Sequence, residues 1–348
     1  MKQRVEIRLL ALPVREQLAT GHNANPDARR QLVIVRVEDS DGAAGWGECA
    51  ALNQPTYTAE WAENAFDSLA AGRPEASEQP MAAAALEMAN LDAQLKTRGV
   101  SLASHLGATR ATVRAGAAVG LMPTADLIER LATLTNDGIA RVKLKIEPGH
   151  EIEPAAAALA TFPGLELHVD GNGSFGPAHL GTLAEMGALG VAVIEQPFAT
   201  NDTSSAATLR KTGVAVIADE GVSSVADAER LLVNEAISGI SIKPPRVGGI
   251  AAAVELLAWC TSNNMRATAG GMLECGLGRH ALAAVAALDG FDITGDVSPA
   301  RRWLAADPFP DVATLGSSVV VPTGPGVAPE PDIELLDRYT IKTATRIA

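Results

Sequence analysis

The sequence predicts an α/β protein, a modified TIM barrel of the (β/α)7β type with a smaller α+β domain before it. The main observation is a repeat between Lys143 and Gly271, where five short apolar runs each end in a charged group. The charged groups are 25, 25, 24 and 24 residues apart, at Lys145, Asp170, Glu195, Asp219 and Lys243. One strand, one helix and two loops use about that length. Because barrel strands end at one mouth, these groups should meet there.

The repeat extends to eight predicted strands. The first is expected at 113–121, and the last two at 266–272 and 291–297. Helices rich in alanine and leucine separate the strands. No full-length helix is evident after the eighth strand, so we expect the barrel to close as (β/α)7β.

The chain before the barrel has a different pattern. Runs at 5–12 and 31–39 alternate like antiparallel strands, and helices are predicted at 58–72 and 80–98. The polar segment 15–30 is expected to be a loop, and the sequence does not decide whether it closes over a substrate.

These patterns divide the chain into three parts. Residues 1–108 form the α+β domain, and residues 109–300 form the barrel. The tail, 301–348, carries a run rich in proline and glycine at 319–332 that cannot be helical. We expect this tail to return to the first domain and complete it.

The predicted mouth holds three carboxylates on adjacent strands, Asp170, Glu195 and Asp219. A single charge at a strand end is usually only solvated, but a set at a constant period indicates a site. Three neighbouring carboxylates repel one another unless a cation neutralises them, and oxygen ligands suit Mg2+, with Mn2+ as a substitute. Lys145 and Lys243 flank them, and a lysine beside a cation should have a lowered pKa, as a general base needs.

Composition limits the classes of partner. Hydrophobic residues make up 47% and charged residues 20% of the 348 residues, which is typical of a globular protein. The net charge of −13 argues against nucleic acid. The three cysteines have no CxxC spacing, and no run is long enough to span a membrane. We therefore expect a cytoplasmic protein with a small-molecule partner; assembly into a homo-oligomer stays open.

One motif favours another class of function. The segment 171–176 fits GxGxxG after a predicted strand and before a predicted helix, like a dinucleotide fingerprint. However, Asp170 would repel a pyrophosphate, and the motif lies inside a uniform series of β/α units. A nucleotide-binding protein is thus the alternative from a different class.

The order of the motifs resembles the muconate-lactonizing group of the enolase superfamily. The motifs are KxK, DxN, EQP, DE, KPPRVGG and GGMLE. The segment 46–61 looks like the capping domain of that group, and the tail resembles its C-terminal segment. Within the group, markers at 243–249, 271–274 and 295–298 resemble the o-succinylbenzoate synthase and N-succinylamino acid racemase branch.

The resemblance implies a role for each matched residue. Lys145 is the base on one face of the substrate, and Lys243 lies on the opposite face. Glu220 supports the metal ligands from behind. The implied Mg2+ ligands are Asp170, Glu195 and Asp219. The implied substrate-binding residues are Lys143, Asn172, Arg246, Gly271 and Met272, with Lys143 and Asn172 polarising the carboxylate.

The activity implied first is that of o-succinylbenzoate synthase, a lyase of menaquinone biosynthesis. The same two lysines also allow N-succinylamino acid racemase activity or both activities, and Arg246 supports that alternative. A muconate-type cycloisomerase is third. Pro245 and Cys275 depart from the residues common in the branch, which leaves the physiological substrate open.

Overall fold

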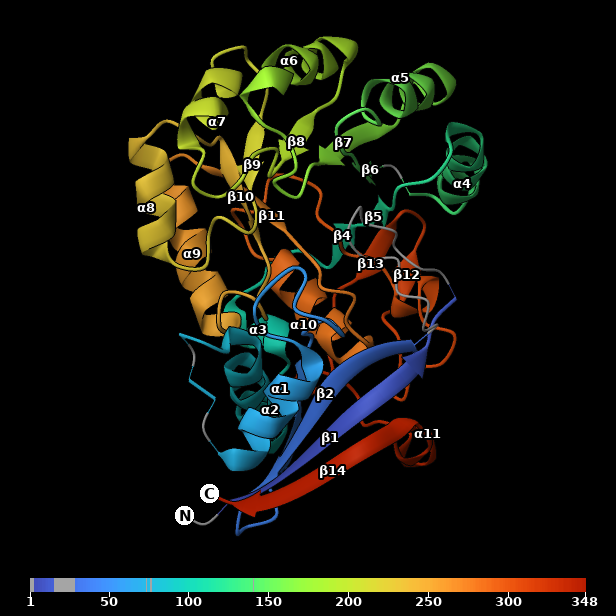
Figure 1. Cartoon of the computed structure of the whole chain (residues 1–348). Helices are drawn as coiled ribbons and strands as arrows, with labels where there is room; N and C mark the ends of the chain where they lie inside the picture. Colours follow the sequence, from blue (N-terminus) through green and yellow to red (C-terminus); the bar gives the residue numbers. More distant parts are fainter. Residues whose placement is uncertain (1–2, 16–28, 73, 76, 140) are drawn as a thin grey trace.

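The computed structural model describes residues 3–15, 29–72, 74–75, 77–139 and 141–348. Figure 1 shows a curled sheet ringed by helices, with a second sheet and its helices on one side and both chain ends close together. The predicted fold class is confirmed. Most of the loop expected at 15–30 lies outside the described residues. In the part of the chain that is described, no helix is both long and apolar enough to cross a bilayer.

Seven parallel strands follow one another around the barrel in chain order. They are β5 (Gly116–Val119), β6 (Arg141–Lys145), β7 (Glu166–Asp170), β8 (Val193–Glu195), β9 (Val216–Ala218), β10 (Gly239–Ile242) and β11 (Arg266–Ala269). Each strand is followed by a helix, as the 24- to 25-residue period predicts. The helices are α4 (Thr124–Asn136), α5 (Ile152–Thr161), α6 (Leu180–Leu189), α7 (Thr203–Arg210), α8 (Val225–Val233), α9 (Ile250–Ser262) and α10 (Gly276–Ala286).

Alternation along β6 shows how the strands place the site. Val142 and Leu144 are buried in the main hydrophobic core. Lys143 and Lys145 alternate with these two residues along the strand, and both contact Asp170. Because strand side chains alternate faces, the two lysines share the inner face, as predicted.

The predicted eighth strand, 291–297, is not a regular strand. The segment closes the barrel through single backbone hydrogen bonds, from Ile293 N to Ala267 O at 3.1 Å and from Gly116 N to Val297 O at 3.1 Å. A Cβ on Gly295 would collide with the carbonyl of β11, so the chain crosses that strand too closely for a standard ladder. The next helix in the described chain is the short η2 (Ala300–Arg302) and not a full-length barrel helix, as (β/α)7β closure predicts.

The predicted first strand, 113–121, is divided in two. Only β5 joins the barrel, while β4 (Thr112–Arg114) pairs with β13 (Ser318–Val320), which also pairs with β12 (Thr314–Leu315). The residues of β4 lie beyond the end of the β5–β6 ladder, where β6 has no residues to pair with them. Their backbone groups therefore bond to β13 of the tail instead. Part of the tail therefore packs against the barrel rather than the first domain.

The capping domain is built on an antiparallel sheet in the order β14, β1, β2, β3, and two of its helices lie against one face (Figure 1). Its strands are β1 (Arg4–Pro13), β2 (Arg29–Glu38), β3 (Ala44–Cys49) and, from the tail, β14 (Thr340–Ile347). Its helices are α1 (Ala62–Ala71), α2 (Pro80–Arg98), α3 (Leu102–Leu106) and α11 (Ile333–Tyr339). Pairing of β14 with β1 confirms that the tail completes this domain.

Local sequence explains two features of this domain. A Cβ on Gly45 or Gly47 would collide with α2 carbonyls, so glycine lets β3 lie directly on that alanine-rich helix. Helix α1 begins at Ala62, four residues after the predicted start, where the Trp61 N–H donates to the Asn64 side chain at 2.8 Å. The divisions after residues 108 and 300 stay predictions.

Candidate active site

The three predicted metal ligands meet at the carboxyl ends of their strands. Asp170 ends β7, Glu195 ends β8, and Asp219 directly follows β9. One carboxylate oxygen from each lies within 4.8 Å of the other two. All three side chains are buried. The donor set is made only of hard oxygen atoms, so it fits a cation such as Mg2+.

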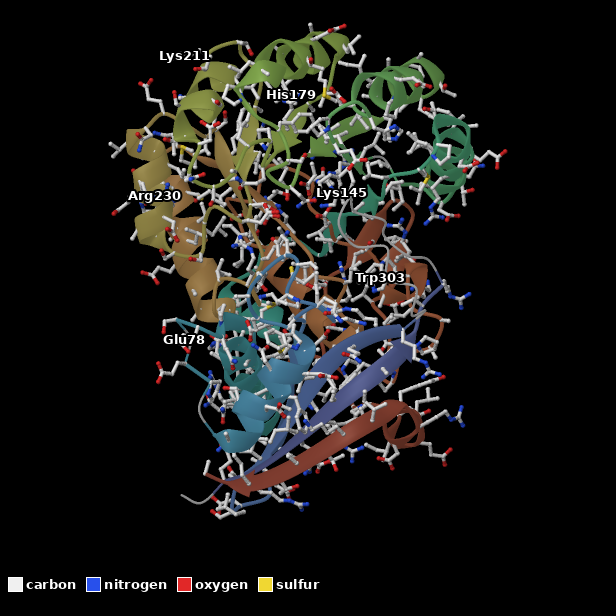
Figure 2. The ribbon with its side chains drawn as sticks, in the orientation of Figure 1. Glu78, Lys145, His179, Lys211, Arg230 and Trp303 are labelled. Carbon is white, nitrogen blue, oxygen red and sulfur yellow. The ribbon has the colours of Figure 1, made fainter. Side chains whose placement is uncertain are left out.

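Each of these carboxylates has a different lysine as its nearest ammonium group. The shortest nitrogen–oxygen distances are 3.0 Å for Lys143–Glu195, 2.7 Å for Lys145–Asp170 and 2.6 Å for Lys243–Asp219. All three lysines line one cavity of about 560 Å³. Figure 2 shows Lys145 among the barrel strands, between the outer helices and the capping sheet.

The carboxylates do not share this compensation equally. Burial raises the pKa of Glu195 to about 7, although Lys143 opposes the rise, and Asp170 and Asp219 add to it. For Asp170, burial also favours a higher pKa, but Lys145 and Lys143 outweigh it and the pKa ends below its ordinary value. The lysines therefore leave one carboxylate of the three poorly neutralised, which a bound cation would correct.

Lys143 is held as a cation by a residue that sequence reasoning gave no role. Burial opposes its charge, but Asp296 and Glu195 raise its pKa well above the ordinary value. Asp296 lies 2.8 Å from Lys143 and 2.5 Å from Arg141. Asp296 lies in the predicted marker 295–298, and that was the one feature of the sequence that pointed to it. A permanent cation here suits the predicted role of polarising a carboxylate.

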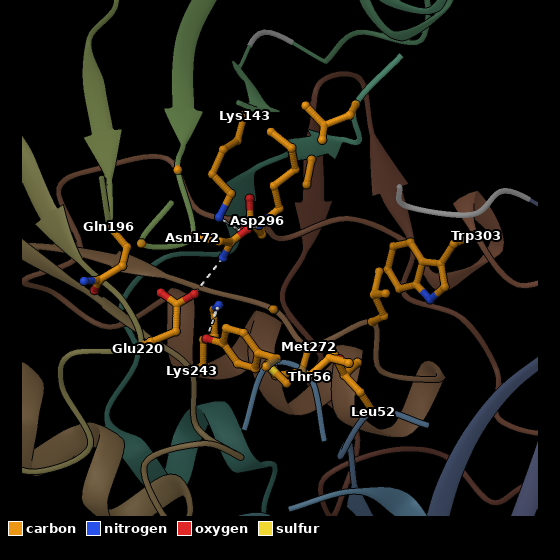
Figure 3. A pocket seen from close by; sticks show the side chains of 18 of the residues that line it. Leu52, Thr56, Lys143, Asn172, Gln196, Glu220, Lys243, Met272, Asp296 and Trp303 are labelled. Carbon is orange, nitrogen blue, oxygen red and sulfur yellow. Dashed lines mark hydrogen bonds and ion pairs between the residues drawn. The ribbon is translucent and has the colours of Figure 1, made fainter. Parts of the chain in front are cut away.

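Asn172 and Glu220 lie together in the cavity lining. Asn172 Nδ2 donates to Glu220 Oε1 at 2.7 Å (Figure 3). Asn172 Oδ1 accepts from Lys145 at 2.5 Å. Burial, followed by the charges of Asp219 and Asp170, raises the pKa of Glu220 to about 7. Glu220, predicted behind the ligands, thus also faces the cavity.

The remaining predicted substrate contacts separate into two groups. Gly271 and Met272 line the cavity. Arg246 is not among the described lining residues; it lies behind Asp219, with Nη2 3.5 Å from that carboxylate and Nη1 donating to Val222 O at 2.6 Å. Cys275 is also buried outside the lining, and its thiol contacts Glu48 at 3.1 Å.

The capping domain supplies residues that sequence reasoning missed. Leu52, Thr56 and Tyr57 of the capping domain and Trp303 of the tail line the cavity. In Figure 3, Thr56 lies on the side of Lys243, and Trp303 lies at another side. The Tyr57 hydroxyl lies 2.9 Å from both Asp219 oxygens. These residues lie on irregular segments, where no periodicity marks them. The only signal was that 46–61 resembles a capping domain.

Backbone N–H groups of the glycine motif are already used in hydrogen bonds within the protein. The N–H of Gly171 donates to Glu195 O at 3.0 Å, and that of Gly173 to Gln196 O at 2.7 Å. Phe175 N donates to Pro197 O at 3.0 Å. The amides that would bind a pyrophosphate are thus used to join two barrel loops, and the geometry gives the nucleotide-binding alternative no support.

A protein-family model described as "Enolase C-terminal domain-like" matches residues 126–335, which is 210 of the 348 residues. The chain belongs to the enolase superfamily. A solved structure of an enolase-superfamily member from Listeria innocua Clip11262 has a TM-score of 0.90 and 30% identity to this chain. That match covers 99% of this enolase-superfamily chain and 98% of the other.

Two relatives with different activities are almost equally similar to this enolase-superfamily chain. One, from Bacillus subtilis (strain 168), is an o-succinylbenzoate synthase with 34% identity, and the match covers 90% of each chain. The other, from Amycolatopsis sp, is an N-succinylamino acid racemase with 33% identity, covering 97% of this chain and 96% of the relative. Lyase or isomerase chemistry is therefore supported in general.

Proposed function

We propose that the chain is an o-succinylbenzoate synthase that uses Mg2+. The carrying observation is that Lys145 lies in the cavity beside the carboxylate triad, with Lys243 on another of the three carboxylates. The substrate would be 2-succinyl-6-hydroxy-2,4-cyclohexadiene-1-carboxylate, and the product would be o-succinylbenzoate. The proposed setting is menaquinone biosynthesis in the cytoplasm.

In this proposal Lys145 acts twice on one face of the substrate. As the free amine, it takes the proton from the carbon next to the carboxylate, and the electron pair passes into the carboxylate to give an enediolate. The electrons then return and expel the hydroxyl group, which receives the proton from the Lys145 ammonium. The substrate thus loses one water and the lysine is regenerated.

The other residues make that weakly acidic proton removable. Asp170, Glu195 and Asp219 would hold Mg2+, which when bound supplies positive charge for the developing enediolate. Lys143, kept charged by Asp296, adds a second positive charge near the carboxylate. Lys243 stabilises the flat intermediate as a cation from the opposite face.

N-succinylamino acid racemase activity is the second candidate, alone or alongside the first. It is favoured because Lys243 lines the same cavity as Lys145, as a two-base reaction requires. One lysine would remove the α proton and the other would return a proton from the other face. Muconate-type cycloisomerisation is third, supported only by the resemblance of the motifs.

The test is to assay the purified protein on both substrates after chelation and again after Mg2+ is restored. We expect dehydration that disappears with the chelator and returns with Mg2+ or, less fully, with Mn2+. Racemisation without dehydration would replace the first candidate by the second. Turnover that chelation does not affect would contradict the proposal as a whole.

A further inference from the structure

The two lysines proposed to transfer protons, Lys145 and Lys243, have partners of different origin. Lys145 contacts Asp170 and Asn172, both from the β7 end of the barrel. Lys243 contacts Asp219 of the barrel, but it also donates to the hydroxyl of Tyr57 at 2.8 Å. Tyr57 belongs to the capping domain and lies 186 positions earlier in the chain. Among the residues that the structure describes, Lys243 is thus held across the domain boundary and Lys145 is held within the barrel.

Tyr57 contacts Lys243 in two ways. Its hydroxyl accepts from the ammonium, and its ring centroid lies 4.7 Å from the same nitrogen. The single phenolic proton is then free to be donated to Asp219, whose two oxygens are each 2.9 Å away. Figure 3 shows Lys243 at the side of the cavity where Thr56 of the capping domain lies. The hydroxyl thus joins an ammonium and a carboxylate with one consistent set of donors.

The loop that carries Tyr57 is tied to the capping sheet. Asn53 donates to the carbonyl of Arg29 at 3.0 Å and accepts from the N–H of Gln31 at 2.9 Å. Arg30 donates to the carbonyls of Ala50 and Ala51, each at 2.6 Å. The position of Tyr57 therefore follows the position of the capping sheet.

Asp219 alone is a poor anchor for a lysine that must exchange protons. As a proposed cation ligand, it shares its negative charge with that cation, so its hold on Lys243 weakens. A tyrosine hydroxyl is neutral, and its ring holds the ammonium by a cation–π contact. Tyr57 can therefore keep the Lys243 nitrogen in place in either protonation state, as acceptor from the ammonium or as a contact to the amine.

We propose that Tyr57 is a positioning residue for Lys243, so that proton transfer on the Lys243 face depends on docking of the capping loop 52–60. Proton transfer on the Lys145 face does not. This inference rests on the proposed function, because it requires that the protein exchange protons next to a carboxylate. It also predicts that the racemase reaction depends more on Tyr57 than the synthase reaction does.

The test measures exchange of the α proton in D2O, separately for each enantiomer of an N-succinylamino acid. The enantiomer that still exchanges in a Lys243→Ala protein is the one that faces Lys145. In Tyr57→Phe we expect the kcat for exchange on the Lys243 face to fall about tenfold, with KM unchanged, since one hydrogen bond to a charged group is lost. On the Lys145 face we expect less than about a twofold change.

The chain offers a matched control, because its other tyrosine is Tyr339 on α11. Tyr339→Phe removes the same hydroxyl far from the cavity and should leave both faces unchanged. Tyr57→Leu, which also removes the ring, should lower exchange on the Lys243 face further than Tyr57→Phe does. Equal losses on both faces in Tyr57→Phe, or no loss, would overturn the inference.

A second readout does not depend on activity. In the metal-free protein, amide hydrogen–deuterium exchange across 52–60 should be about threefold or more faster in Tyr57→Phe than in Tyr339→Phe, because the loop loses its bond to the barrel. If the wild-type protein exchanges neither enantiomer, the racemase candidate fails, and the hydrogen–deuterium exchange of 52–60 alone then tests the contact between Tyr57 and Lys243. Unchanged protection of 52–60 would refute it.

Discussion

The barrel and the capping domain contribute to one cavity in different ways. The barrel supplies the charged groups at constant intervals, on strand ends whose geometry is shared by all its repeats. The capping domain supplies irregular loop residues, of which Leu52, Thr56 and Tyr57 line the cavity. The difference teaches that the regular repeat fixes the positions of the charged groups, while loops that the repeat does not constrain supply another part of the cavity surface.

The two regions are joined by buried polar contacts. Glu48 of β3 accepts from the N–H groups of Cys275 and Gly278, at 2.9 and 2.8 Å, at the start of α10. Arg30 of β2 donates to the carbonyl of Met272 at 3.1 Å. The capping domain therefore fixes the barrel loop that contributes Met272 to the cavity.

The largest expected effect lies in the barrel. Lys145→Ala should lower both dehydration and racemisation by about 1,000-fold or more, because each reaction needs this base. Steady-state kinetics on both substrates would measure it, with Lys211→Ala as the control, since Lys211 lies on the outer surface (Figure 2). Full racemisation by the Lys145→Ala protein would show that the base has been assigned to the wrong lysine.

Lys243→Arg should separate the two reactions. Dehydration needs only a positive charge at this place, so we expect a loss of about 10- to 100-fold, with a measurable trace retained. Racemisation should become undetectable, because arginine, with a pKa above about 12, exchanges protons poorly. Exchange in D2O from the Lys145 side should survive if substrate still binds, and equal losses in the two reactions would contradict the assignment.

The smallest expected effect concerns Glu48, which connects the capping domain to the barrel. Burial, followed by the charge of Glu274, raises the pKa of Glu48 from 4.5 to about 7. Between these values the folded protein binds more protons than the unfolded chain, so this group's contribution to the free energy of unfolding falls as the pH rises. Glu48→Gln removes this dependence of the free energy of unfolding on pH. The free energy of unfolding of the variant, relative to that of the wild type, should therefore rise by about 2 kcal/mol from pH 5 to pH 8.

Urea unfolding of the two metal-free proteins at both pH values would measure this change. Glu78→Gln, which changes an exposed glutamate, is the control and should give the same difference at pH 5 and pH 8. A Glu48→Gln protein that loses stability relative to the wild type as the pH rises would contradict the assigned direction of the pKa shift.

Much of the barrel was predictable because its information is local. The apolar runs, their period and the alternation in β6 predicted the strand order, the carboxylate triad and the inward lysines. The same reasoning was less accurate at 113–121 and 291–297. There the chain leaves the regular ladder to bond with the tail or to cross β11 at Gly295, and neither event changes the local hydrophobic pattern.

The cross-domain contacts were decided only by the tertiary structure. Tyr57 and Lys243 are 186 positions apart, and Glu48 and Cys275 are 227 apart, so no spacing in the chain relates them. Arg246 shows the same limit, since its place in a motif did not indicate that its guanidinium would lie behind Asp219. Periodicity encodes the direction of a side chain from its own strand. Which distant group it meets depends on how whole domains pack.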